Sequence, residues 1–245
     1  MIGDIMTVLW KEGIEMLHMR GSVRSTVTTQ LIPVAIFGIV FPLQFGRQWA
    51  ESPVSLIAWA WIPLIFTITM IADSIAGEKE RRTLETLLAS RLPDRAILLG
   101  KLLISVLYAL ALTALILLSG LVTVNIVHHN KGFIWYNPAF LSAGLGIGLL
   151  ITVFTATTGI LVSLKAHTVR QAAQTMSFGI VIIAVLPGLL FTVLPPAIRK
   201  RVFAAFDSLD GGLALAAVLG VLLVIDCLLL AAAIRRFKRN RLMTD

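Results

Sequence analysis

Residues 77–93 have the sequence GEKERRTLETLLASRLP, the longest strongly charged run in a largely apolar chain. Its leucines recur at spacings of three and four residues, which places them on one face of a helix. These leucines are Leu84, Leu87, Leu88 and Leu92. Gly77 and Pro93 are residues that interrupt helices. We therefore predict one short amphipathic helix over residues 78–91.

Charged side chains cover the other faces of the predicted helix. Glu78 and Arg82 are four residues apart, as are Arg81 and Glu85, so each pair is expected to form an ion pair. Long apolar segments flank the run on both sides, which places it in a loop between two membrane spans. A loop needs no such helix merely to reverse the chain, so we expect the leucine face to be buried against something outside the membrane.

The sequence EKERRTLETLLAS (78–90), followed by RLPDRAILLGKLL (91–103), resembles the cytoplasmic coupling segment of the ABC-2 family of ABC-transporter permeases. In that family the segment joins spans two and three and docks into a groove on a separate ATP-binding subunit. Gly100 and Lys101, at the start of the next span, also match, whereas Arg82 departs because many members have glycine there. The resemblance implies that the ATPase-coupling residues are Glu78, Lys79, Glu80, Arg81, Arg82, Thr83, Leu84, Glu85, Leu87 and Leu88. The alternative is a solvated interfacial helix without a partner.

The composition is typical of a membrane protein. Hydrophobic residues make up 58% of the 245 residues and charged residues only 14%, against about 25% in soluble domains. The mean hydropathy is +0.91. The formal charge of +8 comes from residues at span ends and in loops, so we expect contacts with anionic lipid and none with nucleic acid. The single cysteine, Cys227, excludes a disulfide framework, and we expect no cleaved signal peptide.

The apolar segments predict an all-α integral membrane protein in which residues 1–245 form a single transmembrane domain. Six transmembrane helices are expected, over about 26–45, 54–76, 97–127, 139–164, 175–194 and 213–234. An amphipathic interfacial helix is expected over 1–24, and an outer interfacial or re-entrant element over 195–212. With both termini inside, 16 of the 21 lysines and arginines lie on inner segments and 5 on outer ones. We therefore expect a multi-pass protein of the plasma or inner membrane with both termini cytoplasmic.

Particular residues inside the predicted spans carry structural predictions. Pro33 and Pro42 predict a kinked first span whose freed carbonyl groups are satisfied by neighbouring helices. Gly144 and Gly148 form a GxxxG pattern, which permits close helix packing. The fourth span is rich in threonines, which either line a pathway or bond back to their own helix. These are Thr152, Thr155, Thr157 and Thr158.

Two further features are candidate functional sites. The loop KAHTVRQAAQ (165–174) resembles the basic loop that family members carry before span five, which makes Lys165, His167, Arg170 and Gln171 candidates. Asp226 lies inside the predicted sixth span, where an ionised acid costs several kcal/mol. It is either a functional intramembrane acid or a packing acid at a subunit interface.

Motifs for chemistry on this chain are missing. The sequence contains no GxxxxGK[ST], HExxH or GxSxG pattern and no cysteine cluster. We therefore expect no catalytic, cofactor-binding or metal-binding residues, and a transport subunit rather than an enzyme. The resemblance places ATP and Mg on the partner: it implies two copies of an ATP-binding subunit and a second permease subunit, as a homodimer or heterodimer.

The expected function is that of a permease subunit in an ATP-driven exporter of a lipophilic or amphipathic small molecule, lipid or peptide. Export follows from the resemblance alone. Three alternatives remain open from the residues. The same architecture extrudes sodium, the chain is a channel or secondary transporter that uses Asp226, or it is a membrane anchor or sensor that controls an ATPase without transport.

Overall fold

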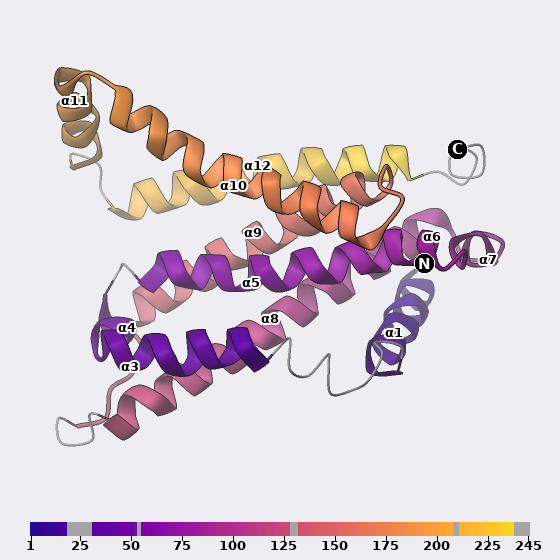
Figure 1. The fold of residues 1–245 in the computed structure, drawn as a ribbon, viewed down its shortest axis with the longest axis horizontal. Coiled ribbons are helices and arrows are strands. Elements are labelled where there is room, and N and C mark those ends of the chain that lie inside the picture. Colours follow the sequence, from indigo (N-terminus) through magenta and orange to yellow (C-terminus); the bar gives the residue numbers. More distant parts are fainter. Residues whose placement is uncertain (19–30, 53–54, 128–131, 208–210, 238–245) are drawn as a thin grey trace.

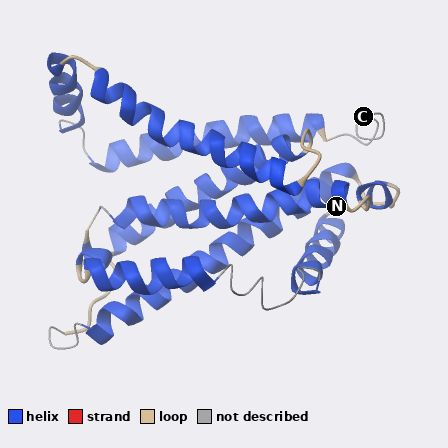
Figure 2. Ribbon diagram, in the orientation of Figure 1, coloured by secondary structure: helices blue, strands red, loops and turns tan. Residues whose placement is uncertain are grey.

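The fold is helical throughout the part of the chain that can be described. The computed structural model describes residues 1–18, 31–52, 55–127, 132–207 and 211–237, and Figure 2 shows these as helices joined by loops, without a strand. Residues 19–24 of the predicted interfacial helix, 26–30 of the predicted first span and 208–210 of the predicted outer element lie outside this description. The all-α fold class is confirmed.

The helices follow the predicted segments closely. The first is α1 (Ile2–His18), and an apolar helix then runs over Leu31–Phe45 and contains the π-helix η1 (Ile36–Val40) and α3 (Phe41–Phe45). The next elements are α4 (Gln48–Glu51), α5 (Ser55–Ala72), the π-helix η2 (Asp73–Gly77), α6 (Glu78–Glu80) and α7 (Leu84–Leu88). The last five are α8 (Asp94–Val127), α9 (Pro138–Ser163), α10 (Val169–Val193), α11 (Pro196–Asp207) and α12 (Gly211–Arg236).

Four helical segments of the described chain are long and apolar enough to cross a membrane. They are Trp61–Glu80, Asp94–Val127, Pro138–Ser163 and Gly211–Arg236. The apolar helix at the predicted first span, Leu31–Phe45, is shorter, and the 25-residue helix α10 at the predicted fifth span is not among the four. The chain is thus a multi-pass membrane protein, and the count of six spans stays a prediction.

Helix α9 occupies the centre of the bundle and contacts α5, α8, α10 and α12. Small residues permit this packing: a Cβ atom on Gly148 would lie 3.6 Å from Pro63 Cγ of α5, and one on Gly159 would lie 2.3 Å from Ile71 Cγ2. Gly148 of the GxxxG pattern therefore faces a helix of its own chain. The four threonines of α9 each donate a hydrogen bond to a carbonyl of α9 four residues earlier. They therefore bond back to their own helix, as one of the two alternatives for these residues expected.

The carbonyl group that Pro42 frees in the first span is satisfied as predicted. Pro42 has no amide hydrogen to offer the carbonyl of Gly38, four residues earlier. Thr123 of α8 donates its hydroxyl hydrogen to that carbonyl, at an Oγ1–O distance of 3.0 Å. The helix changes to a π-helix over Ile36–Val40, next to this point. A neighbouring helix thus satisfies the freed carbonyl group.

The two ends of the bundle differ in what they carry (Figure 1). At one end lie α1, α6, α7 and the C-terminal end of α12, whereas α4 and α11 lie at the other end. We call the first the α7 end and the second the α11 end. Because α1 and the end of α12 share the α7 end, both ends of the described chain lie on the same side of the bundle, as the predicted topology requires.

Candidate functional site

The segment predicted as one helix over 78–91 is instead two short helices separated by a sharp turn. Gly77 has a helical φ of −65° and does not end the preceding helix, which continues through η2 into α6. The break comes at Arg82, whose φ is +56°. The Arg82 amide donates to Lys79 O at 3.0 Å and the Thr83 amide to Glu78 O at 2.9 Å. These two bonds form a Schellman motif, in which Arg82 has the left-handed position that favours glycine.

The turn changes the ion pairs of this segment. Glu78 contacts Lys11 at 2.9 Å and Lys101 at 3.0 Å, and Arg81 contacts Asp73 at 3.3 Å. The predicted pairs, Glu78 with Arg82 and Arg81 with Glu85, are therefore wrong. They assumed an unbroken helix, and a residue four positions on no longer shares a face once the chain reverses at Arg82.

The leucines of this segment face the protein's own interior. Leu84 is 6% exposed, and Leu87 and Leu92 pack against the hydrophobic core that α5, α8, α9 and α10 share. The side chain of Leu88 lies outside the described set. The surface that remains for a partner is polar, because Glu80, Arg82, Glu85 and Thr86 are exposed.

Lys101 of α8 is the centre of a buried ion-pair network. Its side chain is 0% exposed. Its Nζ atom lies 2.6 Å from Glu12 Oε1 of α1 and 3.0 Å from Glu78 Oε1 of α6. It also donates to Ser74 O at 2.7 Å. That carbonyl is accessible because the Glu78 amide donates to Ile75 O within the π-helix instead.

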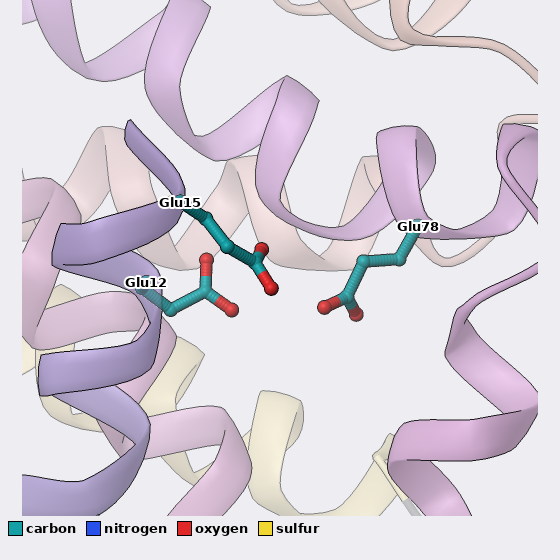
Figure 3. Close-up of side chains that lie close together, drawn as sticks. All are labelled: Glu12, Glu15 and Glu78. Carbon is teal, nitrogen blue, oxygen red and sulfur yellow. The ribbon is translucent and has the colours of Figure 1, made fainter. Parts of the chain in front are cut away.

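Three carboxylates converge around this network. Figure 3 shows Glu12, Glu15 and Glu78 directed toward one another, and their closest oxygen atoms lie within 4.8 Å of each other. Lys11 lies among them, 3.1 Å from Glu15 and 2.9 Å from Glu78. Burial of Lys11 lowers its pKa. The Glu78, Glu12 and Glu15 carboxylates together raise this pKa by more than burial lowers it, so the pKa lies above its ordinary value. The ammonium groups of Lys11 and Lys101 thus offset two of the three negative charges.

Close packing holds α1 in place beside α8. A Cβ atom on Gly100 would lie only 2.6 Å from Val8 Cγ1, and Val8 is 1% exposed. Gly100 therefore lets α1 approach α8 closely enough for Glu12 to reach Lys101. This gives a physical role to Gly100 and Lys101, which the sequence had singled out only by resemblance.

The second loop, over residues 165–174, is bonded to the same segment. Lys79 donates a hydrogen bond from Nζ to Leu164 O, and the Val169 amide donates to Glu80 Oε2 at 3.1 Å. Within the loop, the His167 amide donates to Gln171 Oε1 at 3.0 Å, which shapes the turn into α10. Lys165 and Arg170 are exposed. The structure thus joins the two segments that the sequence proposed separately.

A cavity of about 360 Å³ opens between α1, η2, α6 and α7. Its lining combines charged groups with hydroxyl groups and two apolar side chains. The residues are Lys11, Glu12, Glu15, Met70, Asp73, Ser74, Glu78, Arg81, Thr83, Thr86, Leu87 and Ser90. The sequence pattern alone did not predict that α1 contributes Lys11, Glu12 and Glu15 to this site. The available signal was Lys101, because a cation at the start of an apolar span needs a counter-ion.

Asp226 lies apart from this network, on α12. It is 5% exposed, and neither of its carboxylate oxygens has a hydrogen-bond partner among the described residues. It precedes Arg236, near the α7 end, by ten residues, or about 15 Å along a helix. The structure therefore keeps it a separate candidate.

Comparison with known proteins gives one result. The profile of the family described as "ABC-2 family transporter protein" matches residues 44–208, more than half of the chain. This range contains the two-helix segment and the second loop bonded to it. No curated protein sequence matches the chain.

Proposed function

Because the chain belongs to the ABC-2 family of transporter proteins, we propose that it is a permease subunit whose α6–α7 segment receives the movement of a separate ATP-binding subunit. The observation that carries this proposal is the set of bonds made by three consecutive residues. Glu78 binds α1 and α8, Lys79 binds Leu164 just before the second loop, and Glu80 binds the start of α10. A displacement of this short segment therefore displaces four other elements.

The proposed mechanism uses these bonds as the transmission. Nucleotide binding closes two ATP-binding subunits on one another, and each pushes the exposed face of one α6–α7 segment. Since Lys101 is bonded to both Glu12 and Glu78, α8 and α1 move together with α6. The push then shifts the equilibrium between two arrangements of the spans, by as much as the ATP-bound partner prefers one of them. In this proposal ATP and Mg belong to the partner, and this chain forms a homodimer or heterodimer with a second permease.

For the transported molecule we propose a lipophilic or amphipathic compound, lipid or peptide, exported from the cell. The hydroxyl groups of the four α9 threonines are satisfied within their own helix, so this part of the bundle offers apolar surface. Asp226 supports a second candidate, extrusion of a cation such as sodium, because its two buried oxygens have no partner among the described residues. Replacement by asparagine separates the two: a lipophilic exporter keeps its transport, and a cation exporter loses it.

Partner binding is tested with a charge reversal on the exposed face. The tagged chain is purified from its native membrane, and ATPase activity is measured in the purified material. Glu85→Arg changes an exposed residue of α7 and spares the buried leucines, so it should reduce the recovered ATPase activity. The matched control is Lys200→Glu, a charge reversal of an exposed residue of α11 at the other end. Equal ATPase recovery from all three proteins, or none from the native chain, contradicts the proposal.

Transmission is tested separately from binding. Glu78→Gln removes a buried charge behind the exposed face, so the ATP-binding subunit should still co-purify. Its ATPase activity should no longer respond to the transported compound, because α6 has lost its charged link to Lys11 and Lys101. A Glu78→Gln protein that keeps a normal response contradicts the transmission role, even if partner binding is confirmed.

A further inference from the structure

A groove runs between α10 and α12 over the surface of α9. Both helices pack against α9 but scarcely touch each other, and Figure 1 shows them separating toward the α11 end. Within this groove lies a cavity of about 380 Å³, lined by apolar side chains from α5, α9, α10 and α12. They include Phe154 of α9, Ile183 of α10, and Leu222 and Ile225 of α12.

The apolar cavity offers almost no polar contact. Thr155 contributes to its lining, but its hydroxyl group donates to Ile151 O at 2.7 Å within α9. A polar ligand group placed there would lose its hydrogen bonds to water without replacement. The cavity therefore suits a hydrocarbon chain.

A second cavity, of about 390 Å³, lies between α9, α10 and α12 at the α7 end. It has apolar walls at Leu161 and Val162 and carries two cations, Lys165 and Arg236, beside the amide of Gln171. Neither cation has a carboxylate partner in the described part of the chain. This cavity therefore suits an anionic group.

The two cavities are separated by the depth of about one lipid leaflet. Ile225 lines the first and Arg236 the second, and both lie on the continuous helix α12. Their separation of eleven residues corresponds to about 16 Å along a helix. This is about half of the ~30 Å hydrocarbon thickness of a bilayer. When the cations lie at the level of the lipid headgroups, the apolar cavity lies near the membrane centre.

We propose that this groove binds an anionic phospholipid from the leaflet at the α7 end, with an acyl chain in the apolar cavity and the phosphate at Lys165 and Arg236. The apolar cavity accepts the acyl chain of any phospholipid, whereas the two cations of the second cavity favour an anionic lipid over a neutral one. Each basic residue near a membrane surface strengthens binding to anionic lipid about fivefold. The proposal depends on insertion of the chain in a membrane, and holds whichever compound the protein transports. The site also borders the coupling segment, because Leu164, which accepts a hydrogen bond from Lys79, precedes Lys165.

The test uses Trp61, which lines the apolar cavity, as a fluorescent reporter of acyl chains. The full-length protein is reconstituted in phosphatidylcholine vesicles, to which phosphatidylglycerol or further phosphatidylcholine with brominated acyl chains is added. The chain has five tryptophans, so the Trp61 signal is taken as the difference between the native protein and Trp61→Phe. We expect brominated phosphatidylglycerol to quench Trp61 at lower concentration than brominated phosphatidylcholine.

The paired substitution Lys165→Ala with Arg236→Ala should weaken the effect of phosphatidylglycerol about 30-fold and leave that of phosphatidylcholine unchanged. Exchanging the two cations, Lys165→Arg with Arg236→Lys, keeps the charge and should keep the preference. The matched control, Lys200→Ala with Arg201→Ala, removes two cations from α11 and should also keep it. Equal quenching by both lipids, or a preference that survives loss of Lys165 and Arg236, overturns the proposal. Absence of quenching by either lipid also overturns it.

Discussion

The α5–α6 segment and helix α12 are both apolar enough to span a membrane, yet they differ sharply in how the chain surrounds them. In the most apolar window of Trp61–Glu80, 72% of the residues are buried within the protein, against 6% for Gly211–Arg236. The first segment carries a charged end that is bonded to three other helices. The second contacts mainly α9 and exposes large apolar side chains such as Leu213, Val221 and Leu228.

This difference indicates a division of labour within one subunit. A helix buried on most sides and fixed at its end by ion pairs moves as a unit with its neighbours, which suits a segment that receives a push. A helix with one protein neighbour leaves its remaining surface to lipid, to a transported molecule or to a second subunit. The predictions below test the two regions in turn.

The largest expected effect comes from removing Lys101. Lys101→Met keeps much of the side-chain volume but leaves Glu12 and Glu78 without a buried ammonium group. Breaking a buried ion pair on one side destabilises a protein by about 3–5 kcal/mol, so the thermal unfolding temperature of the purified protein should fall steeply. Lys200→Met, at an exposed residue of α11, is the matched control and should unfold like the native protein.

A double-mutant cycle identifies the partner of Lys101. When Glu12→Gln is added to Lys101→Met, part of the lost stability should return, because one unpaired carboxylate is removed with it. Additive losses from the two substitutions would show that Glu12 and Lys101 are not coupled. The ion-pair network around Lys101 would then no longer distinguish the α5–α6 segment from α12.

A smaller loss of stability is expected when α1 is forced away from α8. A Cβ atom introduced by Gly100→Ala would lie 2.6 Å from Val8 Cγ1, and overpacking of this kind costs about 1–3 kcal/mol. Limited proteolysis should then cleave α1 faster than in the native protein. Gly13→Ala on α1 is the control, because a Cβ atom there meets no atom within 4 Å. Unchanged cleavage of α1 in Gly100→Ala would show that α1 is not held by this contact.

The α12 region is tested by removing its buried acid. Neither oxygen of Asp226 has a hydrogen-bond partner among the described residues, and an unsatisfied buried polar group costs about 1–3 kcal/mol. Asp226→Leu should therefore raise the unfolding temperature of the single chain, whereas Lys101→Met should lower it. A lower unfolding temperature would contradict this and show that Asp226 stabilises the single chain.

The sequence predicted the helices better than the site, for a physical reason. Spans can be recognised because each must present about 20 apolar residues to lipid, and α9 begins and ends within one residue of its predicted bounds. The buried network joins Glu12 to Lys101, which are 89 residues apart, and a periodic pattern reports only on residues within one element. The unpaired cation in an apolar segment was the accessible signal, and it indicated that a partner was needed without identifying Glu12.

The smallest expected effect concerns the turn that divides the α6–α7 segment. A left-handed conformation costs a residue with a side chain about 1–2 kcal/mol, and Arg82 adopts it with a φ of +56°. Arg82→Gly should therefore raise the free energy of unfolding by about 1 kcal/mol, after allowance for the greater freedom of glycine in the unfolded chain. Arg82→Ala removes the same charge but retains a Cβ atom, so it should show no such gain. If both variants lose stability equally, the guanidinium group rather than the turn determines the role of Arg82. If glycine alone stabilises the protein, the preference for glycine at this position follows from the Schellman motif that separates α6 from α7.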